Sequence, residues 1–185
     1  MKLSEHKDLK AAIIALPVKE KDRLLLRLVA KDKVLTEHLH YKILESEGDL
    51  EDRKETIKSN VTAIIPELKA LNAKEALARV RKLIASVNHF YKVTKDPIGE
   101  VELKLFILQQ VPLTYKRSIF GYRDYSFLFA SFYIKTVETT INKLKKLHED
   151  LQFDLADSLN DLLKKIYSSN LKAAAEASSL PKPTS

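Results

Sequence analysis

Cysteine is missing from this 185-residue chain, and glycine and proline are scarce. Without cysteine the protein can form neither disulfides nor thiolate metal sites, and it has no cysteine nucleophile. The 3 glycines and 6 prolines make about 5% of the residues, whereas about 12% is average. Tight hairpins and glycine-rich phosphate loops therefore have little to be made from. These shortages argue against sandwiches, barrels, Rossmann sheets and nucleotide enzymes of the phosphate-loop type.

Long apolar runs are also missing. The N-terminal segment has only the short run Ala11–Leu16, flanked by charges of both signs, which is unlike a signal peptide. No segment approaches the ~20 apolar residues of a membrane span. The chain carries 32 Lys and Arg against 25 Asp and Glu, and 45% of its residues are hydrophobic, which is too many for a disordered protein. We expect a folded, basic, cytoplasmic protein with no membrane partner.

Apolar residues recur three and four apart almost everywhere, which is the period of a helix. The pattern predicts an all-α domain over residues 1–171, with about seven or eight helices in antiparallel pairs, and a flexible C-terminal tail over 172–185. Two helix starts are clear: Asn72 with Glu75 forms a capping box, and Asp96 precedes a proline. The segments Leu24–Val29 and Phe127–Ile134 are nearly continuous in apolar residues, so they are predicted to be the most buried.

Two points of organisation stay open. The apolar series over 125–169 fits one very long helix or two helices, and we favour a break near His148–Asp150 because a domain of this size has little room for a longer helix. The segments that start at Leu16 and Leu71 resemble each other at an offset of 55 residues. A duplicated unit would suit a helical-repeat or bundle-like array, and chance similarity between two amphipathic helices is the alternative.

One segment interleaves cations with aromatic rings. It lies in the loop predicted over 113–125, and its candidate nucleic-acid or partner-binding residues are Tyr115, Lys116, Arg117, Tyr122 and Arg123. Such residues can place rings against bases and cations on phosphates. The alternative is that the rings pin the loop to the core while the cations extend into water.

Catalytic patterns are weak. Glu37 and His40 have the Glu-x-x-His spacing of di-iron bundles, but the second copy that such a site needs is missing. His38 lies two residues from His40, so the two side chains diverge on a helix. These three residues are the metal candidates, and a metal-dependent enzyme stays an alternative. No Gly-x-Ser-x-Gly elbow occurs.

The sequence favours a protein without enzymatic activity and without a cofactor. We expect a helical scaffold or interaction module that binds another protein. The alternative is a nucleic-acid-binding protein that uses the loop over 113–125.

Overall fold

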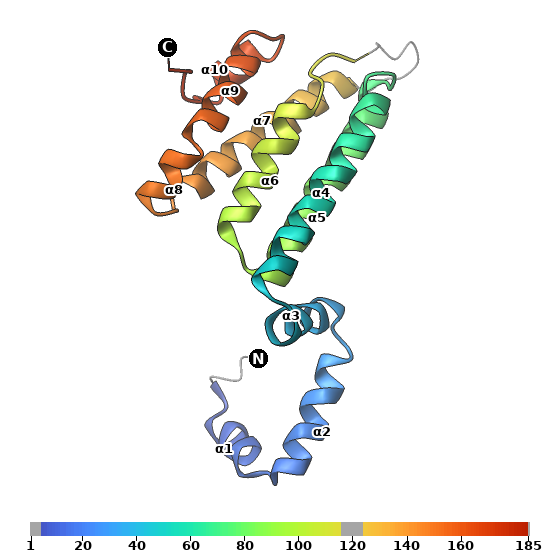
Figure 1. Ribbon diagram of the computed structural model, residues 1–185, viewed down its shortest axis with the longest axis vertical. Helices are drawn as coiled ribbons and strands as arrows, with labels where there is room; N and C mark the ends of the chain where they lie inside the picture. Colours follow the sequence, from blue (N-terminus) through green and yellow to red (C-terminus); the bar gives the residue numbers. More distant parts are fainter. Residues whose placement is uncertain (1–4, 116–123, 185) are drawn as a thin grey trace. The chain divides into compact units, whose positions relative to one another are not determined.

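The computed structural model describes residues 5–115 and 124–184, and these residues form helices and no strands, which confirms the all-α prediction (Figure 1). Ten helices occur in these ranges, of which eight have seven or more residues, close to the predicted number. By their internal contacts the residues fall into two compact units, 1–44 and 45–185. The expected single domain over 1–171 stays a prediction.

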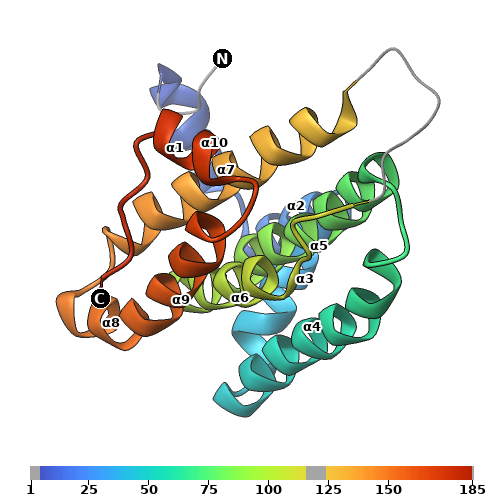
Figure 2. The ribbon, with the colours of Figure 1, turned by 90° about the horizontal axis from the view of Figure 1, so that it is seen from above.

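The C-terminal unit contains the hydrophobic core. Its main helices alternate in direction along the chain: α4 runs up in Figure 1, α5 down, α6 up and α7 down. Figure 2 shows the same helices from above. The bounds are α4 Glu47–Leu68, α5 Ala73–Thr94, α6 Pro97–Gln110, α7 Tyr125–Leu144, α8 Glu149–Asp154, α9 Ala156–Tyr167 and α10 Lys172–Ala177. Helix α6 lies at the centre, in contact with α4, α5, α7 and α9.

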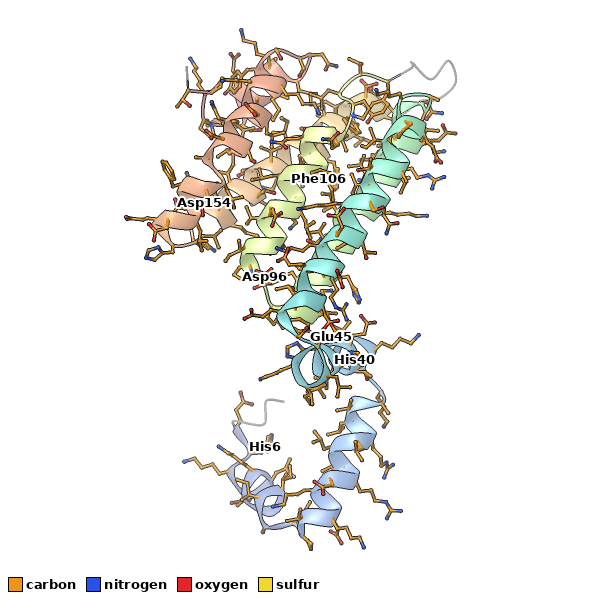
Figure 3. All side chains as sticks on the ribbon, in the orientation of Figure 1. His6, His40, Glu45, Asp96, Phe106 and Asp154 are labelled. Carbon is orange, nitrogen blue, oxygen red and sulfur yellow. The ribbon has the colours of Figure 1, made fainter. Side chains whose placement is uncertain are left out.

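The helix starts of this unit follow the sequence. The Asn72 side chain accepts hydrogen bonds from the backbone N–H groups of Lys74 and Glu75, which confirms the capping box. Asp96 caps α6 in the same way through two backbone N–H groups, both at 3.0 Å (Figure 3). Gly99 lies close behind this cap, and a Cβ at Gly99 would clash with the Asp96 carboxylate and touch the Phe90 ring. The cap therefore needs a glycine at this position.

The series over 125–169 breaks near His148 as predicted, but it forms three helices rather than two, because a second break falls at Leu155 between α8 and α9. Helix α7 ends at Leu144, and His148 precedes the short helix α8. Lys165, on α9, reaches the carboxyl end of α6, where its Nζ donates hydrogen bonds to the carbonyl oxygens of Leu108, Gln109 and Val111 at 3.1, 2.5 and 2.6 Å. These carbonyls have no helical partner of their own. Lys165 therefore ties α9 to the end of the central helix.

The segment predicted to be a tail is placed against α9 over residues 172–184. It begins with α10, in which Ala175 is fully buried, and Leu180 is 7% exposed in the core. The Asn160 side chain accepts a hydrogen bond from the backbone N–H of Thr184 at 2.8 Å and donates one to its carbonyl at 3.2 Å. The Tyr167 hydroxyl donates to the Leu180 carbonyl at 2.8 Å. Specific hydrogen bonds thus hold this segment.

The N-terminal unit consists of α1 Lys7–Ala15, α2 Val18–Val29 and α3 Lys33–Leu44. None of these three helices contains a buried residue. The prediction that Leu24–Val29 is deeply buried is wrong, because Leu25, Leu26 and Leu28 are 58%, 68% and 54% exposed. The helical period is present, but no second layer of the unit covers the apolar face. No helix in the described ranges is long and apolar enough to cross a membrane.

Candidate functional site

The predicted basic and aromatic loop falls mostly outside the described residues. Lys116, Arg117, Tyr122 and Arg123 belong to the segment 116–123, which the structure does not describe. Tyr115 is described, and it is half-buried. The binding role of these five residues stays a prediction.

Tyr115 packs into the C-terminal unit. Its ring meets Phe129 edge to face, with 4.7 Å between the ring centroids, and Phe129 stacks on Tyr133 at 5.9 Å. Its hydroxyl is buried without a hydrogen-bond partner among the described residues, and burial raises the pKa of Tyr115. Tyr133 is also buried, and its hydroxyl donates to the Leu108 carbonyl at 2.6 Å. Tyr115 therefore anchors one end of the loop through its ring.

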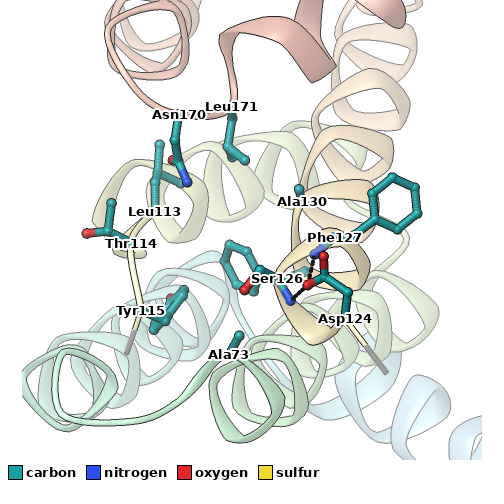
Figure 4. A pocket seen from close by; sticks show the side chains of 11 residues that line it. Ala73, Leu113, Thr114, Tyr115, Asp124, Ser126, Phe127, Ala130, Asn170 and Leu171 are labelled. Atoms are coloured by element: carbon teal, nitrogen blue, oxygen red, sulfur yellow. Dashed lines mark hydrogen bonds between the residues drawn. The ribbon is translucent and has the colours of Figure 1, made fainter. Parts of the chain in front are cut away.

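A cavity of about 460 Å³ opens beside Tyr115 (Figure 4). Leu113, Phe129 and Leu171 supply apolar walls, and Ser126 is a polar neighbour. The titratable acid in its lining is Asp124, whose carboxylate accepts from two backbone N–H groups at the start of α7. Asp124 is thus used as a helix cap. No histidine or lysine is in the described lining.

The metal candidates share α3 but do not form a metal site. Glu37 and His38 are half-buried, and His40, labelled in Figure 3, is exposed. All three take part in interactions with other groups. Among the residues that the structure describes, no group of three or more His, Cys, Asp or Glu side chains could hold a metal ion.

Exposed apolar side chains are concentrated in the N-terminal unit. Over the described part of the chain, ten large hydrophobic residues of this unit are exposed, against three in the C-terminal unit. The ten are Leu9, Ile14, Val18, Leu24, Leu25, Leu26, Leu28, Leu35, Ile43 and Leu44. Four of them lie on two turns of α2. Soluble monomers rarely leave so dense an apolar patch uncovered.

Cations and rings pair along the line where α5 contacts α7. Lys74 Nζ lies 5.5 Å from the Tyr125 ring centroid, and the Arg81 guanidinium lies 5.3 Å from that of Phe132. In each of these two pairs the cation and the ring are 51 positions apart in the sequence. Helices α5 and α7 therefore run parallel with a constant register. A third pair places Lys143 Nζ 4.9 Å from the Tyr91 centroid. We call the surface along these three pairs the α5–α7 seam.

Lys143 differs from the other two cations because it also reaches a buried acid. Its Nζ donates to both oxygens of Glu100, at 2.5 and 2.6 Å, and Lys104 donates to the same carboxylate at 2.7 Å. Glu100 is 1% exposed. A buried carboxylate with two ammonium partners satisfies its lone pairs, so this cluster links α6 to α7 as part of the fold.

Sequence reasoning missed the seam, although a signal for it exists. Lys74 and Arg81 are seven residues apart, and so are Tyr125 and Phe132. Seven residues are two helical turns, so each pair lies on one helix face. The sequence does not say, however, that the two faces meet.

Neither a family model, a curated protein nor a solved structure matches this chain.

Proposed function

We propose that the protein is a non-enzymatic interaction module whose N-terminal unit binds a partner protein through the apolar face of α2. The observation that carries the proposal is the exposure of Leu24, Leu25 and Leu28, at 39%, 58% and 54%. At 100° per residue these three side chains lie within one 100° sector of the helix. An apolar stripe of this width is typical of a helix that packs into a groove of another protein.

The stability of short helices supports the same conclusion. Helices α1, α2 and α3 have 9, 12 and 12 residues, and isolated helices shorter than about 12–15 residues are marginal in water. Local hydrogen bonds hold their ends: Lys21 donates to the Ile14 carbonyl at 3.1 Å, and the Asp32 carboxylate accepts from the Leu35 N–H at 3.0 Å. An N-cap such as Asp32 contributes about 1 kcal/mol. Burial of the apolar stripe by a partner would supply the missing stabilisation.

Charge favours a partner whose groove has an acidic rim. Residues 1–44 contain ten Lys and Arg against six Asp and Glu. On α2, three of these cations recur every four residues at Lys19, Arg23 and Arg27, so they follow one another along the helix. A second copy of the chain would bring the same positive excess, which would oppose association. An acidic rim would complement it.

Site-specific photocrosslinking in cells that carry the protein tests this proposal. A benzophenone amino acid replaces Leu25 on the apolar face, and the matched control carries it at Arg23, about 160° around the same helix. We expect the Leu25 probe to give an adduct with a second protein. The Arg23 probe should not give it, and Leu28→Asp in the Leu25-probe chain should abolish it.

Other products would contradict the proposal. A product of unchanged mass that joins the probe to residues 45–185 would mean that the chain covers its own α2. A product of twice the chain mass would mean self-association, and a lipid adduct would mean a membrane surface. Any of these would exclude a separate protein partner at this face.

A further inference from the structure

We infer that the α5–α7 seam is a binding site for single-stranded nucleic acid. This inference is independent of the proposed function, because it rests on residues of the C-terminal unit alone. The cations Lys74 and Arg81 and the rings Tyr125 and Phe132 carry it.

Unneutralised cations are the first argument. Helix α5 contains five Lys and Arg and one acid, and all five cations are exposed: Lys74, Arg79, Arg81, Lys82 and Lys92. Within the described residues, no carboxylate lies within ion-pair distance of any of them. The acid, Glu75, belongs to the capping box of the same helix. A helix with five unpaired cations attracts a polyanion and gains from counterion release.

The neighbouring helix α4 provides the contrast. It has three cations, and each of them has an acidic partner: Arg53 pairs with Glu45, and Lys54 and Lys58 both pair with Glu102. Six acids lie on α4 itself. Compared with α4, whose cations are largely neutralised, α5 therefore carries an excess of unpaired positive charge. A polyanion that meets the C-terminal unit would be drawn to α5.

The rings decide between classes of polyanion. Tyr125, Phe132 and Tyr91 are half-buried along the seam, and the planar guanidinium of Arg81 lies over one of them. Arg81 covers one face of Phe132, so a base would stack on the planar guanidinium and on the uncovered parts of the half-buried rings. A duplex keeps its bases stacked inside. An acidic peptide would use the cations but would gain nothing from the stacking surfaces. Single-stranded RNA or DNA uses both.

The length of the seam fits an oligonucleotide better than a small anion. From Lys74 to Lys92, an exposed cation on the same face of α5, the helix rises about 27 Å at 1.5 Å per residue. A phosphate or a nucleotide could contact one pair at a time. A stacked strand that rises about 3.4 Å per nucleotide would cover the seam with about eight nucleotides. The constant register of α5 and α7 keeps the first two pairs two helical turns apart, so successive contacts run along one line.

Fluorescence anisotropy of the full chain tests the inference. The probes are labelled ten-nucleotide single strands of RNA and of DNA, a duplex DNA of the same sequence, and a polyglutamate peptide of equal charge, each between 50 and 200 mM salt. We expect micromolar binding of single strands at the lower salt, at least several-fold tighter than that of the duplex or the peptide. The RNA and DNA arms show whether the 2′-hydroxyl contributes.

Matched variants locate the site. Lys74→Ala/Arg81→Ala should weaken single-strand binding about tenfold or more and reduce the slope of log Kd against log salt by about 1.4, which is ~0.7 for each phosphate contact. Lys164→Ala/Lys182→Ala removes the same charge from exposed, unpaired lysines elsewhere and should change Kd less than about twofold. Phe132→Leu keeps an apolar side chain and should weaken binding with an unchanged salt slope, because it removes only the ring.

Four results would each overturn the inference. These are no binding of single strands at 50 mM salt, equal losses in the two double variants, tighter binding of the duplex, and equal binding of polyglutamate. The last of these would assign the seam to an acidic protein segment. Circular dichroism of each variant confirms that the helices are intact.

Discussion

The two units of this chain have the same helical period but differ in what they bury. Helix α5 buries ten of its 22 residues, whereas α1, α2 and α3 bury none. Leu, Ile, Val and Ala are the main apolar residues of both units, although all seven phenylalanines lie in the C-terminal unit, so aliphatic composition does not cause the difference. The cause is the presence of neighbours, since α5 contacts α4, α6 and α7. Periodicity therefore identifies a face that can be buried, and topology decides whether it is.

The sharpest test of this contrast is the same substitution in both units. Leu103 is fully buried on α6, and Leu28 is 54% exposed on α2. Leu103→Ala should lower the free energy of unfolding by about 2–5 kcal/mol, because it leaves a cavity. Leu28→Ala should lower it by less than about 0.5 kcal/mol, as at other exposed positions. Urea denaturation followed by circular dichroism measures both.

A large loss of unfolding free energy in Leu28→Ala would contradict this contrast between the units, because it would mean that α2 is covered in the free protein. A small loss in Leu103→Ala would show instead that the core can relax around α6.

Buried and half-exposed charges on α6 give the next largest effect. Glu100→Gln leaves the buried ammonium of Lys104 without its carboxylate partner, whereas Lys143 is half-exposed and stays hydrated, and the change should cost about 3 kcal/mol. Glu102 has a side chain 30% exposed and pairs with Lys54 and Lys58. Glu102→Gln is the control and should cost less than about 1 kcal/mol, because water screens the pairs. Equal losses in urea denaturation would show that burial does not set the strength of these pairs.

The pH dependence of stability tests the tie between α9 and α6. Burial lowers the pKa of Lys165 to about 8 from 10.5 in the unfolded chain. Between these two values the unfolded state binds the extra proton, so the free energy of unfolding should rise with pH through this window and be flat with respect to Lys165 below it. Near the middle of this pH window the unfolded state binds about one proton more than the folded state. Urea denaturation at several pH values measures the slope.

Lys165→Met is the control, because it removes the titrating group and keeps the length of the side chain. Its unfolding free energy should lack this rise. An identical slope in the two proteins would mean that Lys165 stays protonated in the fold.

Substitutions at helix caps should have the smallest effect on stability, and this effect should differ between the two units. Asp96→Ala removes the acceptor for two N–H groups at the start of α6 and should cost about 1 kcal/mol in global unfolding. Asp32→Ala removes the corresponding cap of α3. We expect it to leave the unfolding of the C-terminal unit unchanged and to speed hydrogen exchange of the α3 amides. A shift of the global midpoint in Asp32→Ala would mean that the two units unfold together.

Local features of the fold were predictable from the sequence because their causes are local. Asn72, Asp96 and the break before Glu149 each depend on a few neighbouring residues. The burial of Leu24–Val29 was predicted wrongly, because it depends on a second layer that the amphipathic pattern of α2 does not specify. In Phe127–Ile134 the prediction holds for Phe129 and Ile134, but Phe127 is 69% exposed. Strong periodicity does not specify how wide the covered face is.

The candidate site was likewise predictable only where its signal is local in the sequence. The sequence singled out Tyr115 in a mixed basic and aromatic segment, where the signal is contiguous along the chain. The pairs of the α5–α7 seam join residues 51 positions apart, so they exist only once α6 has set the register between its two neighbours. Their residue types were visible in the sequence, but their partners were not.

The contact between Lys165 and the end of α6 has a consequence for chemical modification. An acetyl group on Nζ would leave one N–H where three carbonyl oxygens now find donors. The Leu108 oxygen would keep the Tyr133 hydroxyl as a donor, so at least one of the Gln109 and Val111 oxygens would be left without one. Acetylation of Lys165 would therefore weaken the tie between α9 and the end of α6.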